Sequence, residues 1–166
     1  MQKILTPDEK KSLTTLMVIW FTMLGALFTY VIVCYMIMTQ TDFKTMHTPE
    51  WLQTPLFSDI SIIAFVYALA LTILVIGILY YKSSYAKLLL KISNERFESE
   101  EEKFKAFRTQ YTTLMFVNLA IFEAIAIVGL IVFLLTLDFS TFLNLVIVAA
   151  VGFVMVMPSQ TKFHYQ

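Results

Sequence analysis

Four long apolar windows constrain this chain more than any other feature of its sequence. They cover residues 13–38, 60–81, 112–137 and 142–157, and the last window is the shortest. A helix needs about 20 residues to cross the hydrocarbon core of a bilayer. Continuous apolar sequence indicates helices, because the strands of a membrane β-barrel alternate apolar and polar residues. We therefore expect an all-α, polytopic membrane protein with four transmembrane helices in a single domain, residues 1–166.

The composition excludes an ordinary soluble domain. Apolar residues make up 58% of the chain and charged residues 14%, whereas soluble domains carry about 25% charged residues. The first window is longer than the apolar part of a signal peptide and no typical cleavage site follows it, so we expect it to stay as a membrane helix. Cys34 is the only cysteine, which excludes an internal disulfide and favours an apolar packing role.

The positions of the basic residues predict the topology, because Lys and Arg are enriched in cytoplasmic loops. Lys3, Lys10 and Lys11 precede the first window, and Lys162 follows the fourth. A larger group lies between the second and third windows: Lys82, Lys87, Lys91, Arg96, Lys103, Lys105 and Arg108. Only Lys44 lies in the first loop. We expect a multi-pass protein of the plasma (inner) membrane with both termini and the middle loop in the cytoplasm.

The three connections differ in character. Residues 46–52 of the first loop predict a short interfacial helix anchored by Trp51. His47 lies near acidic residues in this loop, but their spacing is not that of a metal site, and we expect no metal. Residues 138–141 form only a tight turn, so the third and fourth helices should be antiparallel neighbours.

The middle connection, residues 82–111, is charged but keeps a helical pattern. It predicts that the second and third helices continue beyond the apolar windows as a cytoplasmic helical hairpin, with the turn in residues 93–99. Ser99 and Glu102 have the spacing of a capping box at the start of the third helix. The charged surface of this hairpin is either a solvated face or a docking surface for a soluble partner, and the sequence leaves both open.

Glu123 is the feature that points to function. It lies about 16 Å along the third apolar window, near the bilayer midplane, and the four windows contain no Lys, Arg or His to pair with it. Burial there favours the neutral acid. Glu123 is then either a group that binds and releases an ion or a donor that holds two helices together, and we favour ion binding. Asn118, Thr72 and Tyr67 are the candidate supporting side chains.

Small residues form stripes on two of the expected helices. Ser61, Ala64, Ala68 and Thr72 recur at spacings of three and four in the second helix. Such stripes allow close helix packing, so we expect this one to contact the third helix near the level of Glu123. A looser stripe in the first helix contains Thr15, Thr22, Gly25 and Thr29, and we expect it to pack within the chain.

Residues 108–132, and above all the sequence from Glu123 to Leu130, resemble the carboxylate-bearing outer helix of the proteolipid (c-type) subunits of rotary ATP synthases and V-type ATPases. The resemblance implies that the second and third helices form a proteolipid-like hairpin with a cytoplasmic loop. It also implies that Glu123 is the ion-binding carboxylate. Sodium-binding members place a hydroxyl beside the carboxylate, whereas Ala124 follows Glu123 here, so the expected ion is the proton.

Two functional hypotheses follow. The first is a proton-binding or proton-translocating subunit of a multi-subunit, ion-driven membrane complex. The second is a non-catalytic accessory or assembly subunit of a larger membrane complex. The expected partners are the lipid bilayer and either other membrane subunits or copies of this chain, with no nucleic acid. No phosphate-binding loop, metal cluster or activated nucleophile is present in the sequence, so we expect neither a cofactor nor catalytic residues of a stand-alone enzyme.

Overall fold

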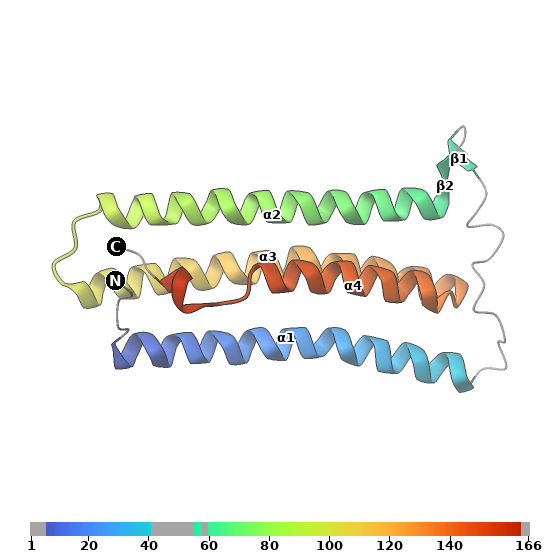
Figure 1. Ribbon diagram of the computed structural model, residues 1–166, viewed down its shortest axis with the longest axis horizontal. Coiled ribbons are helices and arrows are strands. Elements are labelled where there is room, and N and C mark those ends of the chain that lie inside the picture. The colour runs from blue at the N-terminus through green and yellow to red at the C-terminus, as the bar shows by residue number, and fades with distance from the viewer. Residues whose placement is uncertain (1–5, 41–54, 58–59, 164–166) are drawn as a thin grey trace.

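The computed structural model describes residues 6–40, 55–57 and 60–163 (Figure 1). The fold is all-α, as the sequence predicts, and each apolar window falls mainly within one helix, with up to two of its residues beyond the helix end. The helices are α1 (Pro7–Gln40), α2 (Ile62–Asn94), α3 (Glu100–Thr136) and α4 (Phe139–Met155), followed by the short 3-10 helix η2 (Gln160–Phe163). Two short strands, β1 (Pro55–Phe57) and β2 (Ile60–Ser61), pair antiparallel just before α2. The interfacial helix predicted for residues 46–52 lies outside the described residues, as does His47.

The four helices run side by side along the long axis in an up-down-up-down bundle (Figure 1). α3 and α4 are central, since each of them packs against the other three helices. α1 and α2 lie on opposite sides of the α3–α4 pair (Figure 1). The α2–α3 connection and both ends of the chain lie at one end of the bundle, and the α3–α4 turn lies at the other (Figure 1).

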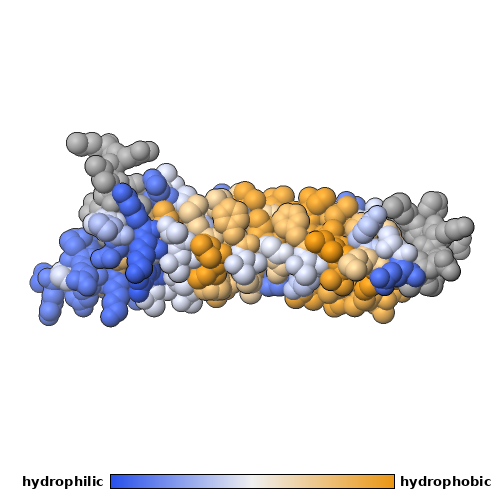
Figure 2. Space-filling view, turned by 90° about the horizontal axis from the view of Figure 1, so that it is seen from below, coloured by the Kyte–Doolittle hydropathy of each residue, from blue (hydrophilic) through white to orange (hydrophobic). Residues whose placement is uncertain are grey.

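Three helices, α1, α2 and α3, are long and apolar enough to cross a membrane, and α4 is a shorter apolar helix of 17 residues. Figure 2 shows a hydrophobic middle section between more hydrophilic ends. The outer surface of this section carries large apolar side chains, including Phe28 at 62% exposure and Leu135 at 70%. Such a surface is suited to a lipid environment and would be a liability in water.

Both predicted small-residue stripes face outward, so the expectation that they pack between helices of this chain is wrong. On α2, Ala64, Ala68 and Thr72 are exposed, and on α1 so are Gly25 and the threonines of its stripe. α2 instead packs through a different face, whose buried residues include Ala70, Gly77, Tyr81 and Leu88. The periodicity shows where small residues gather on a helix. It does not show which face packs against a neighbouring helix, because this depends on the side chains of that neighbour.

Exposed threonine hydroxyls are satisfied within their own helices. Thr22 Oγ1 donates to the carbonyl of Val18 at 2.9 Å, and Thr72 Oγ1 donates to that of Ala68 at 2.7 Å. Thr15, Thr29, Thr109 and Thr113 make the same bond to the carbonyl four residues earlier. Because no water is available in a hydrocarbon core, this bond allows a hydroxyl to face lipid without losing its hydrogen bond.

α2 and α3 both extend beyond their apolar windows, and together they form the helical hairpin that the sequence predicts. Ser99 caps α3 by accepting from the backbone N–H of Glu102 at 3.2 Å. The Glu102 carboxylate accepts from the N–H of Glu98 at 3.0 Å, one residue earlier than a capping box requires. The cap is therefore confirmed, with its second bond shifted by one residue.

The turn between α3 and α4 is tight because two residues reverse the chain. Leu137 ends α3 in the left-handed conformation, with φ of 56°. Asp138 then caps α4: its Oδ1 accepts from the N–H groups of Ser140 and Thr141, both at 3.1 Å. Its Oδ2 accepts from the Thr141 hydroxyl at 2.6 Å. These bonds satisfy a carboxylate that is completely buried and hold α3 and α4 as antiparallel neighbours.

The core is centred on Phe122 of α3, whose buried ring lies between glycines of two other helices. A Cβ on Gly77 of α2 would lie 2.5 Å from the Phe122 Cε1 atom. A Cβ on Gly152 of α4 would lie 2.5 Å from its Cδ1 atom. The absence of both side chains therefore creates the space that this ring occupies.

The chain after α4 folds back onto α2 and α3. The Tyr85 hydroxyl donates to the carbonyl of Lys162 at 2.7 Å. The Lys162 amine donates to the carbonyls of Met155 and Met157, at 2.9 and 2.8 Å, which closes the end of α4. Phe163 is completely buried against a group of aromatic rings, among them Phe107 and Tyr111. In the sequence Lys162 indicates only the topology, and no local pattern predicts this contact.

Candidate functional site

Glu123 forms a hydrogen bond that joins two helices in the apolar section of the bundle. The Tyr30 hydroxyl of α1 donates to the Glu123 Oε1 atom of α3 at 2.9 Å. Both side chains are partly buried. The residues next to Glu123 differ in exposure, since Phe122 is in the core and Ala124 is exposed. Glu123 therefore lies at the edge of the core, beside the α1–α3 contact.

The packing of α1 explains why Tyr30 reaches this position. The buried residues of α1 include Trp20, Leu27 and Cys34, which are spaced by seven residues and form the stripe that faces α3 and α4. Tyr30 lies one turn from both Leu27 and Cys34 and so borders this stripe. Earlier in α1, Trp20 anchors the same stripe to α4, because its indole donates to the carbonyl of Phe153 at 2.9 Å.

The predicted supporting side chains have other partners. Asn118 is completely buried and donates to the carbonyl of Leu114 at 2.8 Å, while its Oδ1 atom has no hydrogen-bond partner. Tyr67 accepts from the side chain of Asn144 at 3.0 Å. Thr72 is bonded within its own helix, as described above. The structure therefore brings Tyr30, rather than Asn118, Tyr67 or Thr72, to the carboxyl group of Glu123.

Sequence reasoning missed Tyr30 because a periodic pattern does not show which helices are neighbours. One signal was available, since Tyr30 and Glu123 lie at about the same distance from the starts of α1 and α3. In an up-down-up-down bundle these two helices run in the same direction and level positions can meet. Ser12 of α1 and Arg108 of α3, which are hydrogen-bonded at 3.3 Å, join the same two helices nearer their N-terminal ends.

The geometry allows Glu123 to exist in two protonation states. A phenol can donate to the carbonyl oxygen of a neutral acid or to a carboxylate, and the second bond is the stronger. The Tyr30 donor is already in place, so loss of a proton would require no new partner at Oε1. The structure therefore places a phenol donor against a carboxyl group within the apolar section of the bundle.

No group of three or more His, Cys, Asp or Glu side chains within the described ranges is placed to hold a metal ion. No protein-family model matches the chain, and no curated protein or solved structure matches it. The evidence for its function is therefore the geometry of its own residues, above all the hydrogen bond between Tyr30 and Glu123.

Proposed function

We propose that the protein is a proton-binding subunit of a multi-subunit, ion-driven membrane complex, in which Glu123 gains and loses a proton. The observation that carries this proposal is the Tyr30–Glu123 hydrogen bond within the apolar section of the bundle. Placing an ionisable side chain in a hydrocarbon core is costly, by about 2.5 to 3.5 kcal/mol for Asp at the centre of a helix on insertion scales. A structural hydrogen bond in a membrane contributes only about 0.6 kcal/mol on average, which does not offset that cost.

The proposed orientation follows from the basic residues. The hairpin of residues 82–111 and both termini lie on the cytoplasmic side of the inner membrane, and α4 is a fourth, shorter transmembrane helix. The structure supports this assignment because both termini and the α2–α3 connection lie at one end of the bundle (Figure 1). Glu123 is then accessible to neighbouring subunits, other copies or lipid from the side of α3 where Ala124 and Ile127 are exposed.

A hydrophobic carbodiimide tests the proposal, because this reagent enters the membrane and reacts with protonated carboxyl groups. We expect Glu123 to be labelled, and the labelling to depend on pH because the reagent requires the protonated carboxyl group. Mass spectrometry of peptides from the protein in native membranes would locate the label. Glu123→Gln should abolish labelling and proton transport by the complex while leaving the subunit folded.

Tyr30→Phe tests the hydrogen bond itself, since it removes the hydroxyl that donates to Glu123 and keeps the ring. The Tyr30 bond is stronger to the carboxylate than to the neutral acid, so it favours loss of the proton from Glu123. Without it, carbodiimide labelling of Glu123 should persist to higher pH. Labelling of Glu123 that does not change with pH, or normal proton transport by the Glu123→Gln variant, would refute proton cycling. Tyr35→Phe on the same helix provides the control, because Tyr35 packs against Phe139 and has no bond to Glu123.

The second candidate function is that of a non-catalytic accessory or assembly subunit, and one observation favours it. The exposed α2 face of Ala64, Ala68 and Thr72 is the type of surface on which a membrane helix of another subunit can approach closely. Ala68→Leu would fill this face without touching Glu123. Loss of co-purifying subunits with normal carbodiimide labelling would favour the accessory role, as would a partner lost on deletion of residues 95–105.

A further inference from the structure

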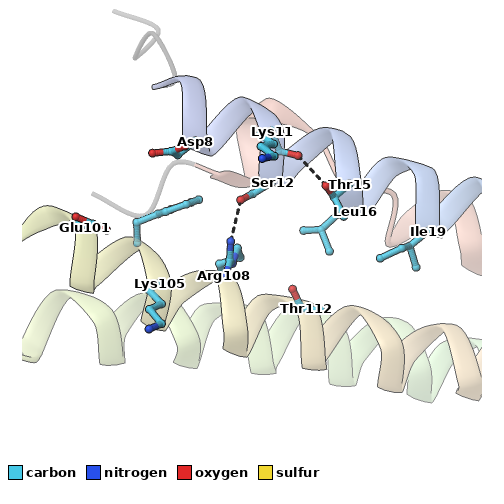
Figure 3. Close-up of a pocket in the computed structure, with 11 residues that line it drawn as sticks. Asp8, Lys11, Ser12, Thr15, Leu16, Ile19, Glu101, Lys105, Arg108 and Thr112 are labelled. Atoms are coloured by element: carbon cyan, nitrogen blue, oxygen red, sulfur yellow. Dashed lines mark hydrogen bonds between the residues drawn. The ribbon is translucent and has the colours of Figure 1, made fainter.

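A cavity of about 440 Å³ lies between the first turns of α1 and the charged part of α3. It opens where the apolar section of the bundle begins, since the apolar windows start at residues 13 and 112. Figure 3 shows its lining side chains extending from both helices, which run in the same direction. Along each helix the lining residues recur every three or four positions, some as adjacent pairs, so each helix presents one surface to the cavity.

The chemistry of the lining changes in order along the cavity. Asp8 and Glu101 lie at the outer end, followed by Lys11, Ser12 and Arg108 (Figure 3). The hydroxyl groups of Thr15 and Thr112 come next, and the inner end is formed by Leu16 and Ile19 (Figure 3). Phe104 and Lys105 also line the outer part, so the cavity passes from mainly charged side chains, acidic and then basic, to hydroxyl groups and finally to aliphatic side chains.

Arg108 is the cation that is best placed in this cavity. Its guanidinium group extends from α3 toward α1 and donates to Ser12 Oγ at 3.3 Å (Figure 3). That bond is long and uses one of five N–H donors, so the planar group keeps donors for a second acceptor. The Lys105 amine, by contrast, is directed away from α1 (Figure 3). Arg108 is thus the cation that faces α1 in this cavity, and Lys11 of α1 is a second basic residue of its lining.

We propose that this cavity binds the headgroup of a phospholipid with a primary amine, of the phosphatidylethanolamine class. From water toward the bilayer, such a lipid presents an ammonium group, a phosphate, ester groups and acyl chains, and the lining presents carboxylates, cations, hydroxyls and aliphatic side chains in the same order. The phosphate bonds to Arg108 and Lys11, and the ammonium group donates to Asp8 and Glu101. The acyl chains pass Leu16 and Ile19. This inference requires the apolar section to lie in a bilayer, and it is independent of the role of Glu123.

The two carboxylates distinguish this ligand from other phospholipids. A choline headgroup carries no N–H donor for Asp8 and Glu101, and its three methyl groups keep the positive charge away from them. A glycerol headgroup leaves the lipid with net negative charge beside two acidic side chains, which is unfavourable. The cavity therefore predicts selection of the amine lipid over both alternatives.

Native mass spectrometry of the whole chain, purified in mild detergent and stripped of lipid, tests this proposal. The probe is an equimolar mixture of phosphatidylethanolamine, phosphatidylglycerol and phosphatidylcholine with matched acyl chains. We expect phosphatidylethanolamine to be the most occupied species. Arg108→Gln should weaken its binding about tenfold, the factor that corresponds to about 1.4 kcal/mol. The Asp8→Asn, Glu101→Gln double variant should remove the preference over phosphatidylglycerol while retaining phosphate binding.

Arg96→Gln and Glu100→Gln are the controls, because both residues are exposed, lie near α3 and do not line this cavity. An unchanged melting temperature shows that each variant is folded. Equal occupancy by the three lipids, or the same preference in the double variant, would overturn the proposal. Excess phosphoethanolamine separates a lipid site from a site for free phosphate compounds: retention of the bound lipid supports a lipid site, and its complete displacement by the soluble headgroup refutes one.

Discussion

Gly152→Ala tests the central packing contact of this bundle. The new Cβ would lie 2.5 Å from Phe122 Cδ1 and 2.9 Å from Cδ2, and contacts under about 3 Å require atoms to move. These atoms are close to the point where the ring joins its side chain, so a small rotation does not relieve the overlap. The ring also has Gly77 beside its far edge, at 2.5 Å from the position of a Cβ there, which limits movement away from α4.

The expected cost follows from two opposing terms. Overpacking a core costs about 1 to 3 kcal/mol, and the blocked ring places Gly152→Ala near the upper end. Replacing glycine by alanine within a helix contributes about 1 kcal/mol of stability. We therefore expect a net loss of about 2 kcal/mol in the free energy of unfolding. Gly25→Ala provides the matched control, because its Cβ would have no neighbour within 4 Å and only the stabilising term remains.

Unfolding by a denaturing detergent in mixed micelles, followed by tryptophan fluorescence, would measure both variants. Phe122→Leu provides the second half of a double-mutant cycle, since a smaller side chain makes room for the added methyl group. In that background Gly152→Ala should cost about 1 to 2 kcal/mol less than in the native protein. Equal stabilities of the Gly152→Ala and Gly25→Ala variants, or purely additive effects with Phe122→Leu, would refute the packing argument.

Three further predictions concern contacts at the two ends of α4. Asp138→Ala should lower the free energy of unfolding by about 1 to 2 kcal/mol, because it removes the α4 cap and leaves the Thr141 hydroxyl without its acceptor, whereas Asp138→Asn should recover part of the loss in the same assay. Trp20→Phe should cost about 1 kcal/mol through loss of the indole bond to Phe153, with little change in helicity by circular dichroism. Burial lowers the pKa of the Lys162 amine from its usual 10.5. Between that lowered pKa and 10.5 the unfolded chain binds more protons, so stability should rise with pH in this window, and Lys162→Met should remove the rise.

The length of the apolar windows was sufficient to predict the helices and the all-α class. The end of α2 and the start of α3 were also predictable, because Ser99 and three acidic residues after it form a strong start signal. The stripes of small residues did not identify the helix faces that pack within the chain. Ala64 and Ala68 have the right spacing for a helix contact, yet the face of α2 that packs is the one with a glycine opposite Phe122.

The candidate site was predictable only in part. Glu123 stands out in the sequence because it is a lone carboxyl group in an apolar helix, but Tyr30 is one of several tyrosines near helix ends and apolar faces. The hydrogen bond from Tyr30 to Glu123 requires α1 and α3 to lie side by side, which is a property of the whole bundle. The contact of residues 160–163 with Tyr85 was hidden for the same reason, since no local pattern indicates where a chain end will pack.

The separation of α1 from α2 determines the order in which this bundle can assemble. Membrane helices enter the bilayer from the N-terminus as the chain is made, and these two helices lie on opposite sides of the α3–α4 pair (Figure 1). Within the described residues, α1 and α2 therefore have no extended interface with each other. Association must wait for α3 and α4, each of which contacts both α1 and α2, so a nascent chain that ends before α3 has two long apolar helices but no folded core.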